Sequence, residues 1–144
     1  MKRVGDFIQK KNSGETIFLF GTRHGTKKGL YQRILKARGL LYQKTDITEQ
    51  RILQKLIIGI KQKPSREMSR KLEDYIVEIM QKRQRTGKSY QVLLGCTELS
   101  LALGDTGIAR LKERLGMEVF NTQEIFSQAI QKHLKSIGWL LSAE

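Results

Sequence analysis

The chain has 144 residues and a formal net charge of +13, from 27 Lys and Arg against 14 Asp and Glu. That length supports one domain with a hydrophobic core and is too short for two domains of ordinary size. No apolar run approaches the roughly 20 residues that span a bilayer, and the N-terminus lacks the apolar segment of a secretory signal. A single cysteine excludes an internal disulfide. We therefore predict a cytoplasmic protein without a membrane partner.

The positive charge is spread along the chain, with some concentration in residues 61–71 and 82–88. It favours attraction to anions of any kind, whether nucleic acid, anionic lipid or a small dicarboxylate. No arginine-rich tail, zinc-ligand spacing or RNP-type aromatic motif accompanies it. The pattern therefore indicates a solvated basic surface, and a nucleic-acid-binding protein is the alternative.

Apolar patterning predicts strands that alternate with helices. Strands are expected at 16–20, 40–42, 90–94 and 117–120. Helical spacing of apolar residues is found in 27–38, 52–60, 68–80, 108–115 and 125–137.

Helix start and stop signals support this order. Gly39 and Gly116 are natural helix stops, Asp46 with Glu49 forms a capping box, and Asn121 is expected to cap the last helix. The alternation predicts a single three-layer α/β domain with a mostly parallel sheet of about four strands. We expect a lead-in at 1–14, the α/β domain at 15–121 and a closing helix at 122–144.

The loop Gly21-Thr22-Arg23-His24-Gly25-Thr26 directly follows the first strand. Backbone N–H groups and a helix dipole at such a junction make a site for a carboxylate or phosphate. The glycine spacing is neither that of a P-loop nor that of a dinucleotide fingerprint, and an ordinary helix-capping loop is equally compatible. His24 shows no paired ligand spacing, so we expect no metal site.

Cys96 follows the apolar run Val92-Leu93-Leu94 and is preceded by Gly95. Ligands of open α/β sheets bind at the carboxyl ends of the strands, where a thiol becomes a thiolate if dipoles or cations lower its pKa. A lone cysteine is otherwise a small buried hydrophobe. Thr97 and Glu98 either cap the next segment or contact a ligand. In the second case Thr97 holds a carboxylate, Glu98 orients an ammonium, and Cys96 takes a proton from the carbon between them.

Taken together, these motifs resemble the aspartate/glutamate racemase family over roughly residues 15–137. Four segments carry the resemblance in addition to the helix at 46–60: Phe20-Gly21-Thr22-Arg23, Gly29-Leu30-Tyr31, Leu94-Gly95-Cys96-Thr97-Glu98-Leu99 with Leu101, and Phe120-Asn121-Thr122. The resemblance implies amino-acid racemisation without pyridoxal phosphate or another cofactor. In such enzymes one cysteine thiolate removes the α-proton and a second cysteine returns a proton on the opposite face, between two similar α/β domains.

The resemblance also implies roles for individual residues. Cys96 matches the cysteine of the C-terminal domain and is the catalytic candidate. The candidates for substrate binding are Thr22, Arg23, Thr97, Glu98 and, by a looser match, Lys61.

Two departures from the family pattern affect these expectations. The first domain with its cysteine is missing, and His24-Gly25-Thr26 differs from the family where a hydroxyl residue is expected at position 25. We therefore expect a C-terminal domain that binds a small acidic amino acid but needs another chain or group as the opposing acid. The alternative is a non-catalytic acidic amino-acid-binding module.

The partner is expected to be a second copy of this chain or a separate N-terminal-domain chain. An apolar stripe in the closing helix favours dimerisation, because it includes large side chains that should not remain in water. Its members are Ile125, Phe126, Ala129, Ile130, Leu134 and Ile137, followed by Trp139-Leu140-Leu141.

Overall fold

The computed structural model describes residues 2–22 and 29–138. Its described strands form one parallel four-stranded sheet in the order β2-β1-β3-β4. The strands are β1 (Thr16–Phe20), β2 (Tyr42–Lys44), β3 (Tyr90–Leu94) and β4 (Val119–Asn121). The predicted α/β class and its parallel sheet are confirmed.

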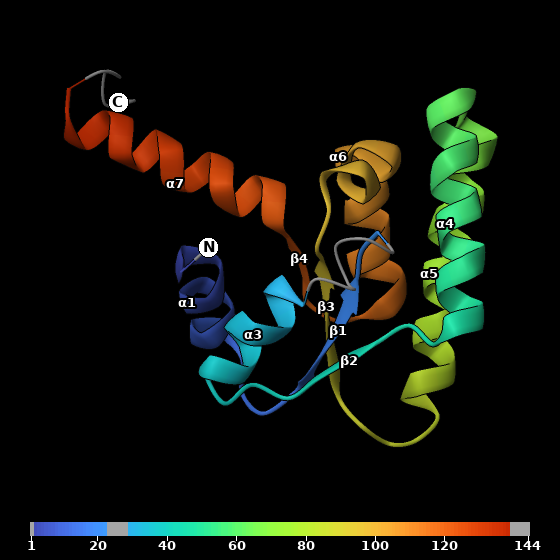
Figure 1. Ribbon diagram of the computed structural model, residues 1–144, viewed down its shortest axis with the longest axis horizontal. Coiled ribbons are helices and arrows are strands. Elements are labelled where there is room, and N and C mark those ends of the chain that lie inside the picture. The colour runs from blue at the N-terminus through green and yellow to red at the C-terminus, as the bar shows by residue number, and fades with distance from the viewer. Residues whose placement is uncertain (1, 23–28, 139–144) are drawn as a thin grey trace.

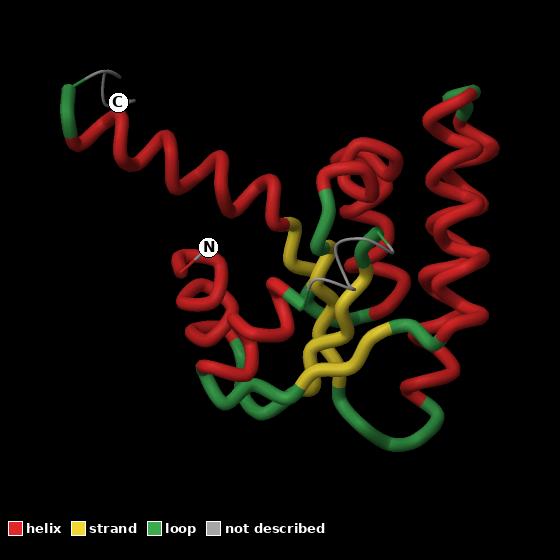
Figure 2. Tube along the Cα trace, viewed as in Figure 1, coloured by secondary structure: helices red, strands yellow, loops and turns green. Residues whose placement is uncertain are grey.

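Helices cover both faces of the sheet (Figure 1). One face packs against α1 (Lys2–Lys11), α3 (Leu30–Ala37) and the start of α7 (Thr122–Ser136). The other packs against α4 (Ile47–Gln62), α5 (Arg66–Gln84) and α6 (Thr97–Leu115). Figure 2 shows the strands between these two helical layers.

Strand β1 lies between β2 and β3, and its side chains alternate between the two cores. Phe18 and Phe20 join the core beneath α4, α5 and α6, whereas Ile17 and Leu19 join the core beneath α1 and α3. All residues of β1 and β3 are buried. A strand buried on both faces reads as a continuous apolar run, which is why both were predictable from the sequence.

The predicted helix ends are also present. The Glu49 N–H donates to Asp46 Oδ1 (2.7 Å) and the Asp46 N–H donates to Glu49 Oε1 (3.1 Å), which completes the capping box of α4. Gly39 and Gly116 adopt left-handed φ values of 67° and 62° just beyond α3 and α6. Asn121 caps α7 by accepting from the Gln123 N–H (3.1 Å).

Four elements differ from the sequence-based expectation. Residues 2–11 form α1, whose Val4 and Ile8 are fully buried. Strands β2 and β4 each begin two residues later than expected, at Tyr42 and at Val119. Helix α6 starts at Thr97 rather than at position 108, because a break at Gly104 (φ 67°, ψ 171°) interrupts the helical pattern.

A buried carboxylate joins α5 to α6. The Glu73 side chain is fully buried, and it accepts from Arg110 Nε (2.8 Å) and from Arg114 Nη1 (2.5 Å). Both arginines remain about one third exposed, at 35% and 37%. This cluster holds the second part of α6 against α5.

Helix α7 leaves the sheet at β4 and runs beside α1, where Arg3 Nη1 donates to Ala129 O (3.3 Å), and its later turns project from the domain (Figure 1). Ile125 is buried, but Ile130 and Ile137 are 59% and 53% exposed. The apolar stripe is therefore only partly covered by its own domain within the described residues. No helix in the described ranges combines the length and apolar character needed to cross a membrane.

Candidate functional site

Cys96 lies at the carboxyl end of β3, where α6 begins. It is the N-cap residue of α6, and its Sγ accepts a hydrogen bond from the Leu99 N–H at 3.4 Å. The preceding Gly95 donates its N–H to Phe20 O (2.7 Å). A Cβ at Gly95 would lie 2.8 Å from Leu19 Cδ1 and 3.2 Å from Phe20 O, so the Leu19 side chain would have to shift to admit it.

The two strand ends meet at Thr22 and Cys96. Thr22 follows β1, and its backbone is hydrogen-bonded to the Cys96 thiol. β1 and β3 are parallel neighbours with Phe20 opposite Leu94, so Thr22 and Cys96 lie at the same edge of the sheet. Arg23 and the His24-Gly25-Thr26 segment lie outside the described residues.

The environment of Cys96 favours the protonated thiol. Burial raises the pKa of the thiol, and the neighbouring Glu98 carboxylate raises it further. Backbone hydrogen bonds from Leu99, Glu98 and Thr22 act in the opposite direction, but the pKa stays above its ordinary value. At neutral pH Cys96 therefore carries its proton. Its surroundings do not lower its pKa as those of a resting thiolate would.

Lys61 and Glu98 form an ion pair close to Cys96. Lys61 Nζ, in the last turn of α4, lies 2.9 Å from Glu98 Oε1, in the first turn of α6. Their side chains are 61% and 32% exposed, so both groups are accessible to a ligand. A zwitterionic ligand has complementary charges for both: its ammonium for Glu98 and a carboxylate for Lys61.

Thr97 faces a different hollow. This exposed residue lines a cavity of about 370 Å³ together with α7 side chains that include Gln123, Phe126 and Ile130. The structure therefore brings Thr22, Lys61, Cys96 and Glu98 to one edge, with Thr97 on the side of that edge that faces α7.

Two polar contacts that the sequence analysis did not assign support this edge. Thr122 Oγ1 donates to Leu94 O (3.0 Å), and the Tyr31 side chain is hydrogen-bonded to that of Thr122. Burial raises the pKa of Tyr31, and the nearby Cys96 raises it slightly more. The Gly29-Leu30-Tyr31 and Phe120-Asn121-Thr122 segments were recognisable in the sequence. Only the fold brings Tyr31 and Thr122 together.

Asn121 contributes a second support. Ser100 Oγ donates to Asn121 Oδ1 (2.7 Å) in a buried contact, and it also lies 3.5 Å from Cys96 O. The end of β4 is thus tied to the first turn of α6. This contact restrains the backbone of Cys96 at the residue that carries the thiol.

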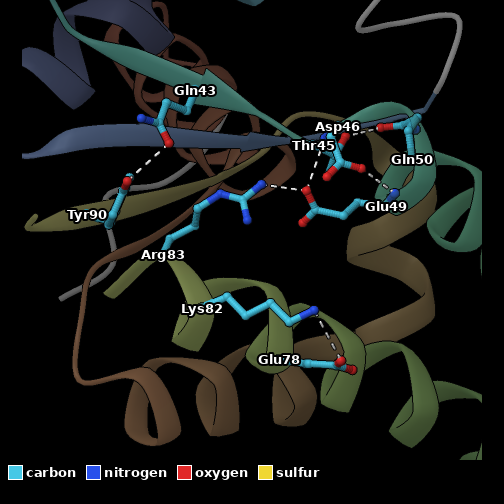
Figure 3. Close-up of polar contacts among 9 residues, drawn as sticks. All are labelled: Gln43, Thr45, Asp46, Glu49, Gln50, Glu78, Lys82, Arg83 and Tyr90. Atoms are coloured by element: carbon cyan, nitrogen blue, oxygen red, sulfur yellow. Dashed lines mark hydrogen bonds and ion pairs between the residues drawn. The ribbon is translucent and has the colours of Figure 1, made fainter. Parts of the chain in front are cut away.

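A polar cluster of Thr45, Asp46, Glu49, Gln50 and Arg83 lies at the start of α4 (Figure 3). Gln50 Nε2 donates to Gly21 O (2.9 Å) and Gln50 Oε1 accepts from Thr45 Oγ1 (2.5 Å). Arg83 Nη2 donates to Glu49 Oε1, the same oxygen that completes the capping box. Since Gly21 directly precedes Thr22, the Gln50 contact holds the end of β1 next to the residue that meets Cys96.

The described residues hold no group of three or more His, Cys, Asp or Glu that could bind a metal ion. Among the described residues, this edge offers the Cys96 thiol, the Glu98 carboxylate, the Lys61 ammonium group and backbone N–H groups. Such a set can bind a small zwitterion and exchange a proton with it.

No protein-family model matches the sequence, and no curated protein matches it. Solved structures match its fold, among them an aspartate racemase and a homologue of one. An aspartate racemase homologue from Pyrococcus horikoshii superposes with a TM-score of 0.72 at 23% identity, over 92% of this chain and 54% of that one. The aspartate racemase of Picrophilus torridus gives a TM-score of 0.66 at 18% identity, over 98% of this chain and 52% of that one. The resemblance found in the sequence is thus confirmed at the level of the fold: the chain spans about half the length of these structures and has the fold of that half.

Proposed function

We propose that this chain is the half of a cofactor-independent racemase that acts on one face of a small acidic amino acid, with Cys96 as its proton-exchanging group. The observation that supports this most directly is the meeting of Cys96 with Thr22 at adjacent strand ends, beside the Lys61–Glu98 pair. The fold shared with aspartate racemases is consistent with it.

In this proposal the ligand separates the Lys61–Glu98 pair. The α-ammonium binds Glu98 and a carboxylate binds Lys61, while Thr22 and Arg23 complete the substrate contacts and Thr97 borders the site on the side that faces α7. Neutralising Glu98 removes one of the charges that raise the pKa of Cys96. Ligand binding therefore lowers the pKa of the Cys96 thiol, and a larger fraction of it is thiolate in the complex than in the free protein.

The proton balance limits what one thiol can do. The Cys96 thiolate takes the α-proton, which leaves a carbanion and a neutral thiol. After the S–H exchanges with solvent, the same sulfur returns a proton to the same face. Inversion needs a second acid on the opposite face, and we propose that another chain supplies it, either a second copy or a separate N-terminal-domain chain.

Exchange of the α-hydrogen in deuterated water tests this proposal. The purified chain is incubated with L- and D-aspartate and with L- and D-glutamate, and deuterium incorporation and configuration are followed by NMR and chiral chromatography. We expect deuterium to enter one enantiomer with retention of configuration, with no racemisation at an enzymatic rate. Cys96→Ser should abolish the exchange.

Two outcomes would overturn the proposal. Exchange that persists in Cys96→Ser would assign the chemistry to another group. Binding of aspartate or glutamate by calorimetry without any exchange would support the second candidate, a binding module, which the raised pKa of Cys96 favours.

A further inference from the structure

Helices α4 and α5 and the turn between them carry a concentrated positive charge. Residues 51–71, called here the basic hairpin, contain seven Lys and Arg and one Glu, a net of +6 out of +13 for the whole chain. The two helices stand side by side (Figure 1), and their turn extends beyond the sheet.

Most of this charge is not neutralised by the protein. Across the described ranges, only two of the seven cations form ion pairs, Lys61 with Glu98 and Lys71 with Glu67. The remaining cations of the basic hairpin are exposed, and they are Arg51, Lys55, Lys63, Arg66 and Arg70. Charges held this close repel one another, so an anionic partner would stabilise the arrangement.

The spacing of these cations suits a polyanion. Arg51 and Lys55 are four residues apart on α4, as are Arg66 and Arg70 on α5, so each pair shares a helix face at a rise of about 6 Å. Lys63 lies in the turn between the two pairs. A small anion would engage at most one pair, whereas a chain of regularly spaced phosphates is long enough to reach from one pair past Lys63 to the other.

The basic hairpin lacks the features of a membrane-binding helix. Such a helix buries a continuous apolar face in the lipid interface. The apolar face of α4, with Leu53, Ile57 and Ile60, is already packed in the core. The exposed Ile52 and Ile58 lie on different sides of the helix and form no continuous face.

We propose that the basic hairpin binds the phosphate backbone of nucleic acid, without sequence preference and separately from the amino-acid site. The sequence alone indicated a solvated basic surface because the charge is spread along the chain. The fold changes that interpretation, since it places unpaired cations from two helices on one protruding hairpin.

Fluorescence anisotropy with a short labelled DNA duplex and a labelled single-stranded RNA tests the proposal. The variant Lys63→Glu/Arg66→Glu/Arg70→Glu is compared with the control Lys36→Glu/Lys88→Glu/Lys112→Glu, whose three positions are also exposed. Both variants lower the formal net charge from +13 to +7. Circular dichroism melting establishes that each variant is folded.

We expect the affinity of the hairpin variant for the labelled nucleic acids to fall by about tenfold or more. The affinity of the control variant should fall far less. The slope of log Kobs against log salt should flatten by about 2.7 in the hairpin variant, since each lost phosphate contact removes about 0.9. Equal losses in both variants would show that net charge alone governs binding and would overturn the proposal. So would a wild-type chain that ignores both nucleic acids, or one that prefers phosphatidylserine vesicles to them.

Discussion

Cys96 is placed where its chemistry and the stability of the fold have different requirements. As the N-cap of α6 it must satisfy the Leu99 N–H, yet the thiol sulfur is a weak acceptor at 3.4 Å. Serine, threonine, aspartate and asparagine are the residues that cap helices best. We therefore predict that Cys96→Ser stabilises the fold while removing the proposed activity.

The magnitude follows from the capping contact. Exchanging serine for alanine at an N-cap costs about 1 kcal/mol, and the weak sulfur acceptor puts the wild type between the two. We expect Cys96→Ser to raise the free energy of unfolding by about 0.5 kcal/mol. Cys96→Ala should lower it by about 1 kcal/mol, because it also loses the buried sulfur. For a chain of this size, 1 kcal/mol corresponds to about 3–4 °C in Tm.

Thermal unfolding followed by far-UV circular dichroism gives the order directly. Cys96→Ser should have the highest Tm, the wild type the next and Cys96→Ala the lowest. Neither variant should support α-hydrogen exchange. The competing effect is the cost of burying a hydroxyl without a partner for its own proton. A Cys96→Ser protein that melts below Cys96→Ala would refute the capping argument.

Three further predictions concern charge and assembly. Glu98→Gln should lower the pKa of Cys96, because it removes a carboxylate that raises it. The pH profile of iodoacetamide alkylation should therefore move to lower pH, and an unchanged profile would contradict the assignment. Replacing both arginine partners of Glu73 by alanine should cost about 3–5 kcal/mol in urea unfolding, because the buried carboxylate then has no partner. Glu73→Leu should cost less, since the arginines it leaves reach water, and equal losses would count against this account. Sedimentation should show concentration-dependent dimers that Ile130→Asp with Ile137→Asp disrupts, and a wild-type chain that is monomeric at every concentration would exclude this use of α7.

The elements buried on both sides were the most predictable from sequence. β1 and β3 each contain a run of at least three consecutive apolar residues, and α4 begins at a capping box, so local patterns were sufficient. α1 was missed because only Val4, Gly5 and Ile8 are buried within a lysine-rich stretch. The first part of α6 was missed because Gly104 and Gly107 dilute a helical pattern that Leu99 and Leu103 stabilise only by burial in the core.

The sequence was sufficient to predict where the candidate site lies, but not which of its residues contact one another. That Thr22 and Cys96 meet follows from parallel strand order. Lys61 and Glu98 were each named, but their contact joins residues 37 positions apart and depends on how α4 and α6 pack. The raised pKa of Cys96 comes from burial, which no local motif reveals.

The position of β1 in the sheet has a consequence for how the chain folds as it is synthesised. β1 pairs with β3 from Thr16 opposite Tyr90 to Phe20 opposite Leu94. Until β3 has left the ribosome, β1 can pair only with the three-residue strand β2, and the edge of β1 that faces β3 has no partner strand. Pairing between segments so distant in sequence is slow, because the intervening chain must be closed into a loop first. The nascent chain therefore carries an unpaired strand edge until β3 is made. Such an edge is prone to aggregation, and chaperone dependence during expression is the expected result.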